Sequence, residues 1–135
     1  IAPTWFSLAD TEGNVSSLAD AEYVNYAHQS NLEVWAVLRD FHGGINSYDE
    51  TYELLSYTSK RTKVINQVIA EALQSGIDGI NLDFELISLR TAANIIYSLC
   101  GNCLSSADRM VLYFRWTIMC PSRTMHIMIS KSRER

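Results

Sequence analysis

Polar and apolar residues alternate most regularly between positions 78 and 85, which read DGINLDFE. Successive side chains of a strand point to opposite faces of its sheet, so this stretch is predicted to be a strand with two different faces. Ile80, Leu82 and Phe84 form the apolar face, and Asn81, Asp83 and Glu85 form the polar face. Buried carboxylates cost several kcal/mol unless they are paired or hydrogen-bonded. The polar face is therefore not an ordinary core surface.

The rest of the first 94 residues predicts strands that alternate with helices. Continuous apolar runs indicate buried strands, an apolar period of 3.6 residues indicates helices, and Gly76 stands where a helix would end. The expected elements are a strand over 1–6, a loop over 7–16, a helix over 17–29 with Ser17 and Asp20 as a capping box, a strand over 32–41, a short helix over 48–57, a helix over 59–75 capped by Ser59, the strand that starts at 78, and a helix from Thr91.

This order of elements indicates parallel strand–helix units, and hence an α/β sheet or barrel. Three such units are too few to close an eight-stranded barrel, which takes about 250 residues. The 135 residues have the length of one ordinary domain. The chain contains neither a run of about 18 apolar residues, as a membrane span requires, nor a visible signal peptide. Because it begins with Ile1, we expect it to be a piece of a longer protein.

Charge is distributed unevenly along the chain. Residues 1–94 contain 13 acidic and 5 basic side chains, whereas residues 95–135 contain 2 acidic and 6 basic ones and all the cysteines and methionines. A basic tail with a Cys100–Cys103 pair is compatible with a nucleic-acid-binding or metal-binding module. A second cysteine pair is absent from the sequence, so this indication is weak. His28 and His42 are expected at the surface, because neither has a second metal ligand at suitable spacing.

The spacing D-x-x-N-x-D-x-E resembles the signature of family 18 glycoside hydrolases, whose usual form is D-G-x-D-x-D-x-E on the fourth strand of a TIM barrel. The sequence departs from that form at Asn81. The segments APTWFSL, YV-YAH and LEVWA look similar to a bacterial branch that acts on chitin-like or peptidoglycan-derived glycans, including spore-cortex fragments. The resemblance extends over residues 1–94. It implies a partial (β/α)₈ barrel that contains about strands two to four and their helices.

The resemblance also implies a substrate-assisted retaining mechanism, an exception to the two-carboxylate rule for glycosidases. Glu85 would be the general acid and later the base, and Asp83 would hold the acetamido N–H of the substrate and stabilise the oxazolinium intermediate. Asn81 would hydrogen-bond Asp83 without adding charge. Asp78 belongs to the same motif, but its position in the alternation places it on the opposite face from Asn81, Asp83 and Glu85. We therefore expect it to have a structural role near the start of the strand. Trp5 would either stack on a sugar ring or pack in the core.

The implied partner is a chitin-like or peptidoglycan glycan, with no cofactor, nucleic acid or membrane, and the implied location is secreted, cell-wall or spore-associated. An alternative is a non-catalytic, lectin-like relative of the same fold, although the presence of Glu85 argues against it because binding alone does not need an acid. The tyrosine-bearing strand that such enzymes use beside the acid is absent from the sequence. We therefore expect the isolated chain to be inactive.

Residues 95–135 do not continue the family pattern, although 110–119 are compatible with a strand. Reading the last base of each codon with the first two of the next turns Met110-Val111 into Gly, Trp116-Thr117 into Asp and Met119-Cys120 into Val. Translation in this shifted frame is compatible with the family-like segments NGIVL and VDNYVP. We therefore expect a frame change near 94–96, with an irregular, out-of-frame tail after it. The alternative is a divergent C-terminal segment.

Overall fold

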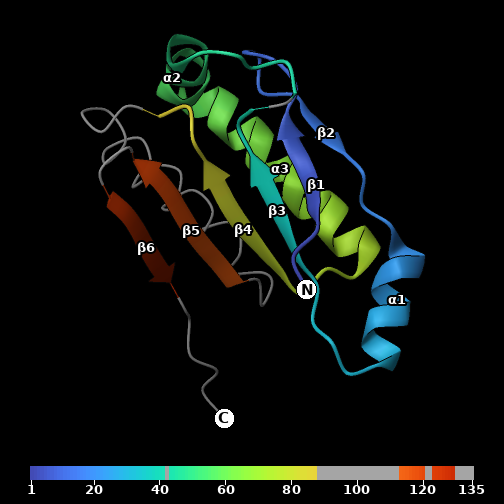
Figure 1. Ribbon diagram of the computed structural model, residues 1–135. Helices are drawn as coiled ribbons and strands as arrows, with labels where there is room; N and C mark the ends of the chain where they lie inside the picture. The colour runs from blue at the N-terminus through green and yellow to red at the C-terminus, as the bar shows by residue number, and fades with distance from the viewer. Residues whose placement is uncertain (42, 88–112, 121–122, 130–135) are drawn as a thin grey trace.

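The computed structural model describes residues 1–41, 43–87, 113–120 and 123–129. They form a sheet with helices packed against it (Figure 1). The elements are β1 (Thr4–Leu8), β2 (Val15–Ser17), α1 (Ala21–Gln29), β3 (Trp35–Arg39), α2 (Tyr48–Ser56), α3 (Thr58–Ser75), β4 (Gly79–Phe84), β5 (Tyr113–Cys120) and β6 (Arg123–Ile129). The expected helix from Thr91, the Cys100–Cys103 pair and His42 lie outside the described residues.

The sheet has six strands in the order β2-β1-β3-β4-β5-β6. Neighbouring strands run parallel from β1 through β3 and β4 to β5, whereas β2 and β6 pair antiparallel at the two sides. The predicted α/β class with parallel strand–helix units is confirmed. Within the described ranges the strands form a sheet with two outer edges, β2 and β6, and not a closed barrel.

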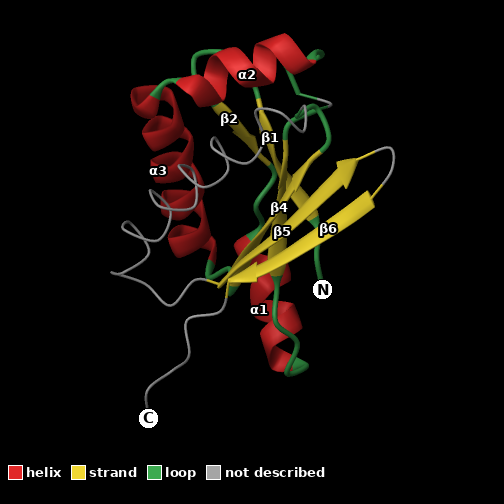
Figure 2. Cartoon of the chain, turned by 90° about the vertical axis from the view of Figure 1, so that its left-hand side faces the viewer, coloured by secondary structure: helices red, strands yellow, loops and turns green. Residues whose placement is uncertain are grey.

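The core lies between the helices and one face of the sheet. Figure 2 shows α3 lying along one side of the sheet. Helix α3 contributes Val64, Ile65, Val68 and Ala72, whose spacing places them on one side of the helix. The strands contribute seven core residues that are at most 3% exposed, namely Phe6, Leu8, Ala36, Leu38, Ile80, Leu82 and Phe84. This apolar layer fixes which face of each strand is turned away from α3.

The ends of the helices differ partly from the prediction. Helix α3 begins at Thr58 without a side-chain cap, so the cap expected at Ser59 is wrong, but it ends as predicted at Gly76, which has a positive φ of 75°. Helix α1 is capped by Asp20, whose carboxylate accepts the backbone N–H groups of Glu22 and Tyr23. The expected cap Ser17 instead lies in β2. A carboxylate next to the first turn also complements the helix dipole, which explains the preference for Asp20.

Residues 7–16 are more ordered than the loop that the sequence predicts. Strand β1 extends to Leu8 and pairs with β2 in a hairpin. The turn of this hairpin contains Gly13, whose φ is 83°, and the Asp10 carboxylate accepts the backbone N–H groups of Glu12 and Asn14. The side-chain amide of Asn14 also donates to Asp10 Oδ2, and this bond lowers the pKa of Asp10. The polar residues that predict a loop therefore form only the turn of this hairpin, and residues on both sides of the turn belong to strands.

The expected irregular C-terminal segment is wrong for residues 113–120 and 123–129, which form β5 and β6. The sequence YFRWTIMC of β5 is rich in aromatic and β-branched residues, which favour strands. It pairs along the whole of β4, from Gly79–Tyr113 to Phe84–Ile118. The strand thus lies within the range 110–119 that the sequence marks as compatible with one, except for Cys120 at its end.

Candidate functional site

The two faces of β4 differ as the alternation predicts. Ile80, Leu82 and Phe84 are at most 2% exposed and belong to the core. Asn81 and Asp83 point to the other side and are partly exposed. The apolar residues hold the strand against α3, so the amide and the carboxylate must face away from that helix.

The strand register places three polar residues beside one another. Ser7 of β1 is paired with Arg39 of β3, and Arg39 is paired with Asp83 of β4. In a parallel sheet, residues paired in this way project from the same face. We call this face, which also carries Asn81, the polar face. It brings together residues that are 76 positions apart in the chain, from Ser7 to Asp83.

Two opposing effects act on the carboxyl group of Asp83. Burial raises its pKa above the usual value, and the positive charge of Arg39 reduces that rise. Burial has the larger effect because it disfavours the charged carboxylate, whereas Arg39 makes no ion pair with it within 4.0 Å. A carboxyl with a raised pKa keeps its proton to a higher pH than an ordinary aspartic acid does.

The side chain of Asn81 has an unusual environment. Its Oδ1 atom is buried and, among the described residues, has no hydrogen-bond partner. The expected hydrogen bond between Asn81 and Asp83 is not present in the described part of the chain. A buried carbonyl without a donor is costly, so this oxygen is available to a donor from a bound molecule.

Glu85 follows β4 directly, at the carboxyl end of the parallel strands where α/β folds place their active sites. Its backbone N–H donates to Asp40 Oδ1 at 3.0 Å, and the N–H of Leu86 donates to Asp40 Oδ2 at 2.7 Å. Asp40 is fully buried and follows β3. Burial raises its pKa, and the two N–H donors only partly offset that effect. Asp40 therefore fixes the backbone that carries Glu85.

Sequence reasoning missed both Arg39 and Asp40. Each stands at the carboxyl end of a buried parallel strand, in the segment VLRD, directly beside the residues of β4 that the motif singles out. The available signal was that two charged residues end an otherwise apolar strand. Its meaning depended on the register between β3 and β4, which the sequence pattern does not contain.

Asp78 lies at the other end of β4. Its Oδ2 atom accepts the N–H of Val34 at 2.8 Å and lies 2.8 Å from His28 Nε2. Seven residues of extended chain separate Asp78 from Glu85, which corresponds to about 23 Å. Although it belongs to the motif, Asp78 is not brought to the candidate site, and it links the start of β4 to the segment between α1 and β3. His28, with a side chain 40% exposed, lies at the surface as predicted.

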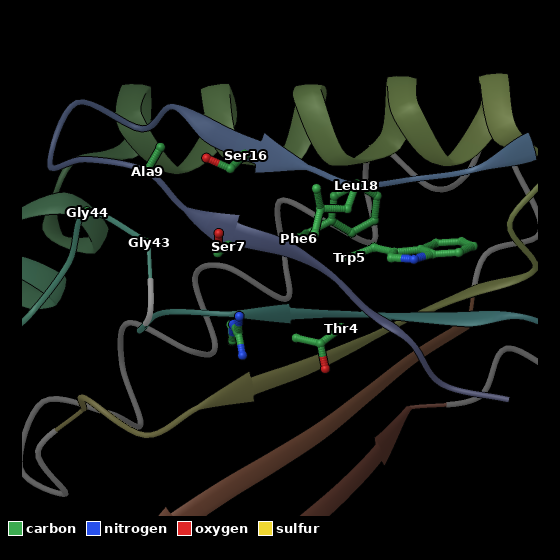
Figure 3. Close-up of a pocket in the computed structure, with 10 residues that line it drawn as sticks. Thr4, Trp5, Phe6, Ser7, Ala9, Ser16, Leu18, Gly43 and Gly44 are labelled. Atoms are coloured by element: carbon green, nitrogen blue, oxygen red, sulfur yellow. The ribbon is translucent and has the colours of Figure 1, made fainter.

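Trp5 packs in the core, which is one of the two roles that the sequence left open, and its stacking on a sugar ring stays a prediction. It packs against the core and makes an edge-to-face contact with Tyr23, with ring centroids 5.4 Å apart. It also lines a pocket between the β1–β2 hairpin and the loop after β3 (Figure 3). The register of β1 against β3 shifts between Thr4 and Phe6, at the position of Trp5.

Neither a metal centre nor a membrane helix emerges from the described ranges. No group of three His, Cys, Asp or Glu side chains there could hold a metal ion. No helix in the same ranges has both the length and the apolar character needed to span a bilayer.

Solved structures share this fold. A protein from Bacillus subtilis described as a sporulation-specific glycosylase matches 85% of the chain with a TM-score of 0.75 and 16% identity. The spore cortex-lytic enzyme SleL from Bacillus megaterium matches 85% with a TM-score of 0.72 and 14% identity. A chitinase from Chromobacterium violaceum matches 84% with a TM-score of 0.67 and 16% identity.

The chain spans 38%, 26% and 36% of the lengths of these three proteins, respectively. No protein-family model matches the chain, and no curated protein matches it either. At these identities the similarity shows that the chain has the fold of part of a chitinase-like domain.

Proposed function

We propose that the chain carries the acid-bearing part of the active site of a glycoside hydrolase that acts on N-acetylglucosamine-containing glycans. The observation that carries this proposal is the position of Glu85 at the carboxyl end of β4, where Asp40 holds its backbone N–H. Asp83 and Asn81 lie on the polar face of the same strand. The shared fold with chitinases and with a spore cortex-lytic enzyme supports the same substrate class.

In the proposed reaction, Glu85 protonates the glycosidic oxygen and the acetamido carbonyl oxygen of the substrate attacks the anomeric carbon. The leaving sugar departs with the proton, and Asp83 stabilises the positive oxazolinium that forms. Glu85 then removes a proton from water as the water opens the oxazolinium ring. Asn81 orients the acetamido group, since its buried Oδ1 atom has no partner among the described residues and can accept a hydrogen bond from a bound molecule. The nucleophile belongs to the substrate, so this chemistry needs no cofactor.

The proposed substrates are chitin-like or peptidoglycan polymers, which places the protein outside the cell, in the cell wall or in the spore. The resemblance to family 18 glycoside hydrolases extends only to about residue 94. The tyrosine-bearing strand that such enzymes use beside the acid is not part of that range. We therefore propose that the chain is inactive by itself and that activity requires the remaining barrel strands. The proposed frame change near 94–96 separates this chain from those strands.

The test uses the source gene with its flanking DNA, expressed both as it stands and with the frame restored after residue 94. The restored protein is expected to release the dye from a chitin-oligosaccharide reporter, and the 135-residue chain is not. Glu85→Gln should lower kcat of the restored protein by about 10² to 10⁴-fold, because a positioned general acid contributes that factor. Glu22→Gln is the matched control, since Glu22 is exposed in α1.

Two results would contradict the proposal. Unchanged turnover of the reporter by the Glu85→Gln variant would show that Glu85 is not the general acid. Sugar binding without any turnover in the restored protein would instead favour the lectin-like alternative.

A further inference from the structure

The pocket beside Trp5 lies next to the polar face and is large enough for a sugar unit. Its volume is about 460 Å³, within the range of small-molecule sites. Figure 3 shows Thr4, Trp5 and Ser7 on one strand, with Ser16 and Leu18 from the neighbouring segment of the hairpin. The remaining lining residues are Phe6, Ala9, Arg39, Gly43 and Gly44.

The wall formed by Gly43 and Gly44 is fixed by close backbone contacts. A Cβ atom on Gly43 would lie 2.1 Å from the carbonyl oxygen of Leu8, and the N–H of Gly44 donates to that same oxygen. The loop after β3 therefore rests directly on the end of β1. The pocket is therefore built by two segments of the fold that are in direct backbone contact.

Arg39 is the charged group of this pocket, because every other described lining residue is neutral. Its Nε atom is buried and has no hydrogen-bond partner among the described residues. Its guanidinium lies 5.6 Å from the centre of the Phe41 ring, a contact that attracts the charge but accepts no N–H bond in the guanidinium plane. A buried donor without an acceptor costs free energy, which a bound acceptor would recover.

The neighbouring carboxylates do not take that position. Asp83 is next to Arg39 in register, but no carboxylate oxygen of the described residues lies within 4.0 Å of the guanidinium. Arg39 is thus placed to bind an anion from outside the chain.

We propose that this pocket is a subsite for a carboxylate-bearing sugar that adjoins the N-acetylglucosamine unit of the substrate. Arg39 matches a carboxylate through its planar fork of N–H donors, Ser7 and Ser16 offer hydroxyl groups, and Trp5 offers an apolar ring surface. One guanidinium without a second cation suits a single negative charge. The subsite rests on the proposed function and narrows it to glycans in which N-acetylglucosamine alternates with an acidic sugar.

The test measures binding to the full chain by tryptophan fluorescence and calorimetry, which need no turnover. The probes are N-acetylglucosamine linked to N-acetylmuramic acid, N-acetylglucosamine linked to glucuronic acid, and neutral chitobiose. Arg39→Met should weaken binding of the acidic disaccharides by about tenfold or more and leave chitobiose unchanged. Arg39→Lys, which keeps the charge but not the fork, should have an intermediate affinity. Lys63→Met is the control, because Lys63 is exposed and is not part of the pocket.

Binding of both acidic disaccharides through Arg39 supports recognition of the carboxylate itself, and binding of the muramic acid compound alone supports recognition of its lactyl group. Equal affinities for acidic and neutral disaccharides would overturn the subsite and leave the proposed function standing. Binding of acidic sugars through Arg39 without any binding of chitobiose would uphold the subsite and refute the chitin-like part of the proposed substrates. Absence of binding by every disaccharide to a chain with native circular dichroism would overturn the subsite.

Discussion

The backbone at Glu85 depends on one buried carboxylate from a neighbouring strand. Asp40 accepts two consecutive N–H groups, from Glu85 and Leu86, just where β4 ends and its own sheet bonds stop. Without Asp40, both part-buried donors would need other partners. A single side chain thus converts the end of a strand into a fixed support for the proposed acid.

Asp40→Asn tests the balance between burial and these bonds through its pH dependence. Burial raises the pKa of Asp40, so the folded state favours its neutral form. The stability that this proton contributes is complete below the unfolded pKa of about 3.9 and is lost as the pH rises through the higher folded pKa. The wild type should therefore lose stability relative to Asp40→Asn as the pH rises above about 3.9 and through the raised folded pKa of Asp40. Urea unfolding of both chains measures the difference, and a wild-type advantage that grows with pH would contradict the expectation.

Glycines join elements of the fold at two places. The loop from β3 to α2 touches the end of β1 at Gly43 and Gly44, and the end of α3 turns into β4 at Gly76. These contacts differ in kind. At Gly44 the space for a side chain is absent, whereas at Gly76 the space exists and only the backbone angle is unfavourable.

Alanine substitutions should separate the two cases. A Cβ atom on Gly44 would lie 1.7 Å from the carbonyl oxygen of Ala9, so Gly44→Ala should destabilise the fold by about 3 kcal/mol or more. At Gly76, with φ of 75° and the nearest atom at 3.7 Å, the cost should be about 1–2 kcal/mol. Urea unfolding of both variants gives the comparison. An equal or smaller loss in Gly44→Ala would show that the loop after β3 can move away from β1.

At the scale of the whole molecule, β4 lies inside the sheet and is paired on both sides. β3 lies along one edge and β5 along the other, both parallel to it. The unpaired edge of a strand accepts almost any segment of high β-propensity, since the hydrogen bonds come from the backbone. The pairing of β5 with β4 is therefore compatible with either origin of residues 95–135, and the proposed frame change stays a prediction.

Sequencing the source DNA across codons 94–96 is expected to reveal an insertion or deletion that restores the family-like reading. The restored protein should unfold at a higher urea concentration than the present chain, because further barrel strands would cover apolar surface at the sheet edges. The matched comparison is the same gene with the frame left as it is. A confirmed intact frame would remove the hypothesis and leave a divergent C-terminal segment.

The sequence alone determined the local features. The alternation of polar and apolar residues distinguished the two faces of the strand over 79–84, and placed Asp78 apart from the other motif residues. The apolar spacing located α3, and Gly76 marked its end. Each of these depends on side-chain direction and backbone angles within a few residues. Only the tertiary structure placed Arg39 beside Asp83 and Asp40 under Glu85, because strand register and crossing contacts depend on distant segments. It also formed the pocket at Trp5, whose lining residues come from positions 4 to 44.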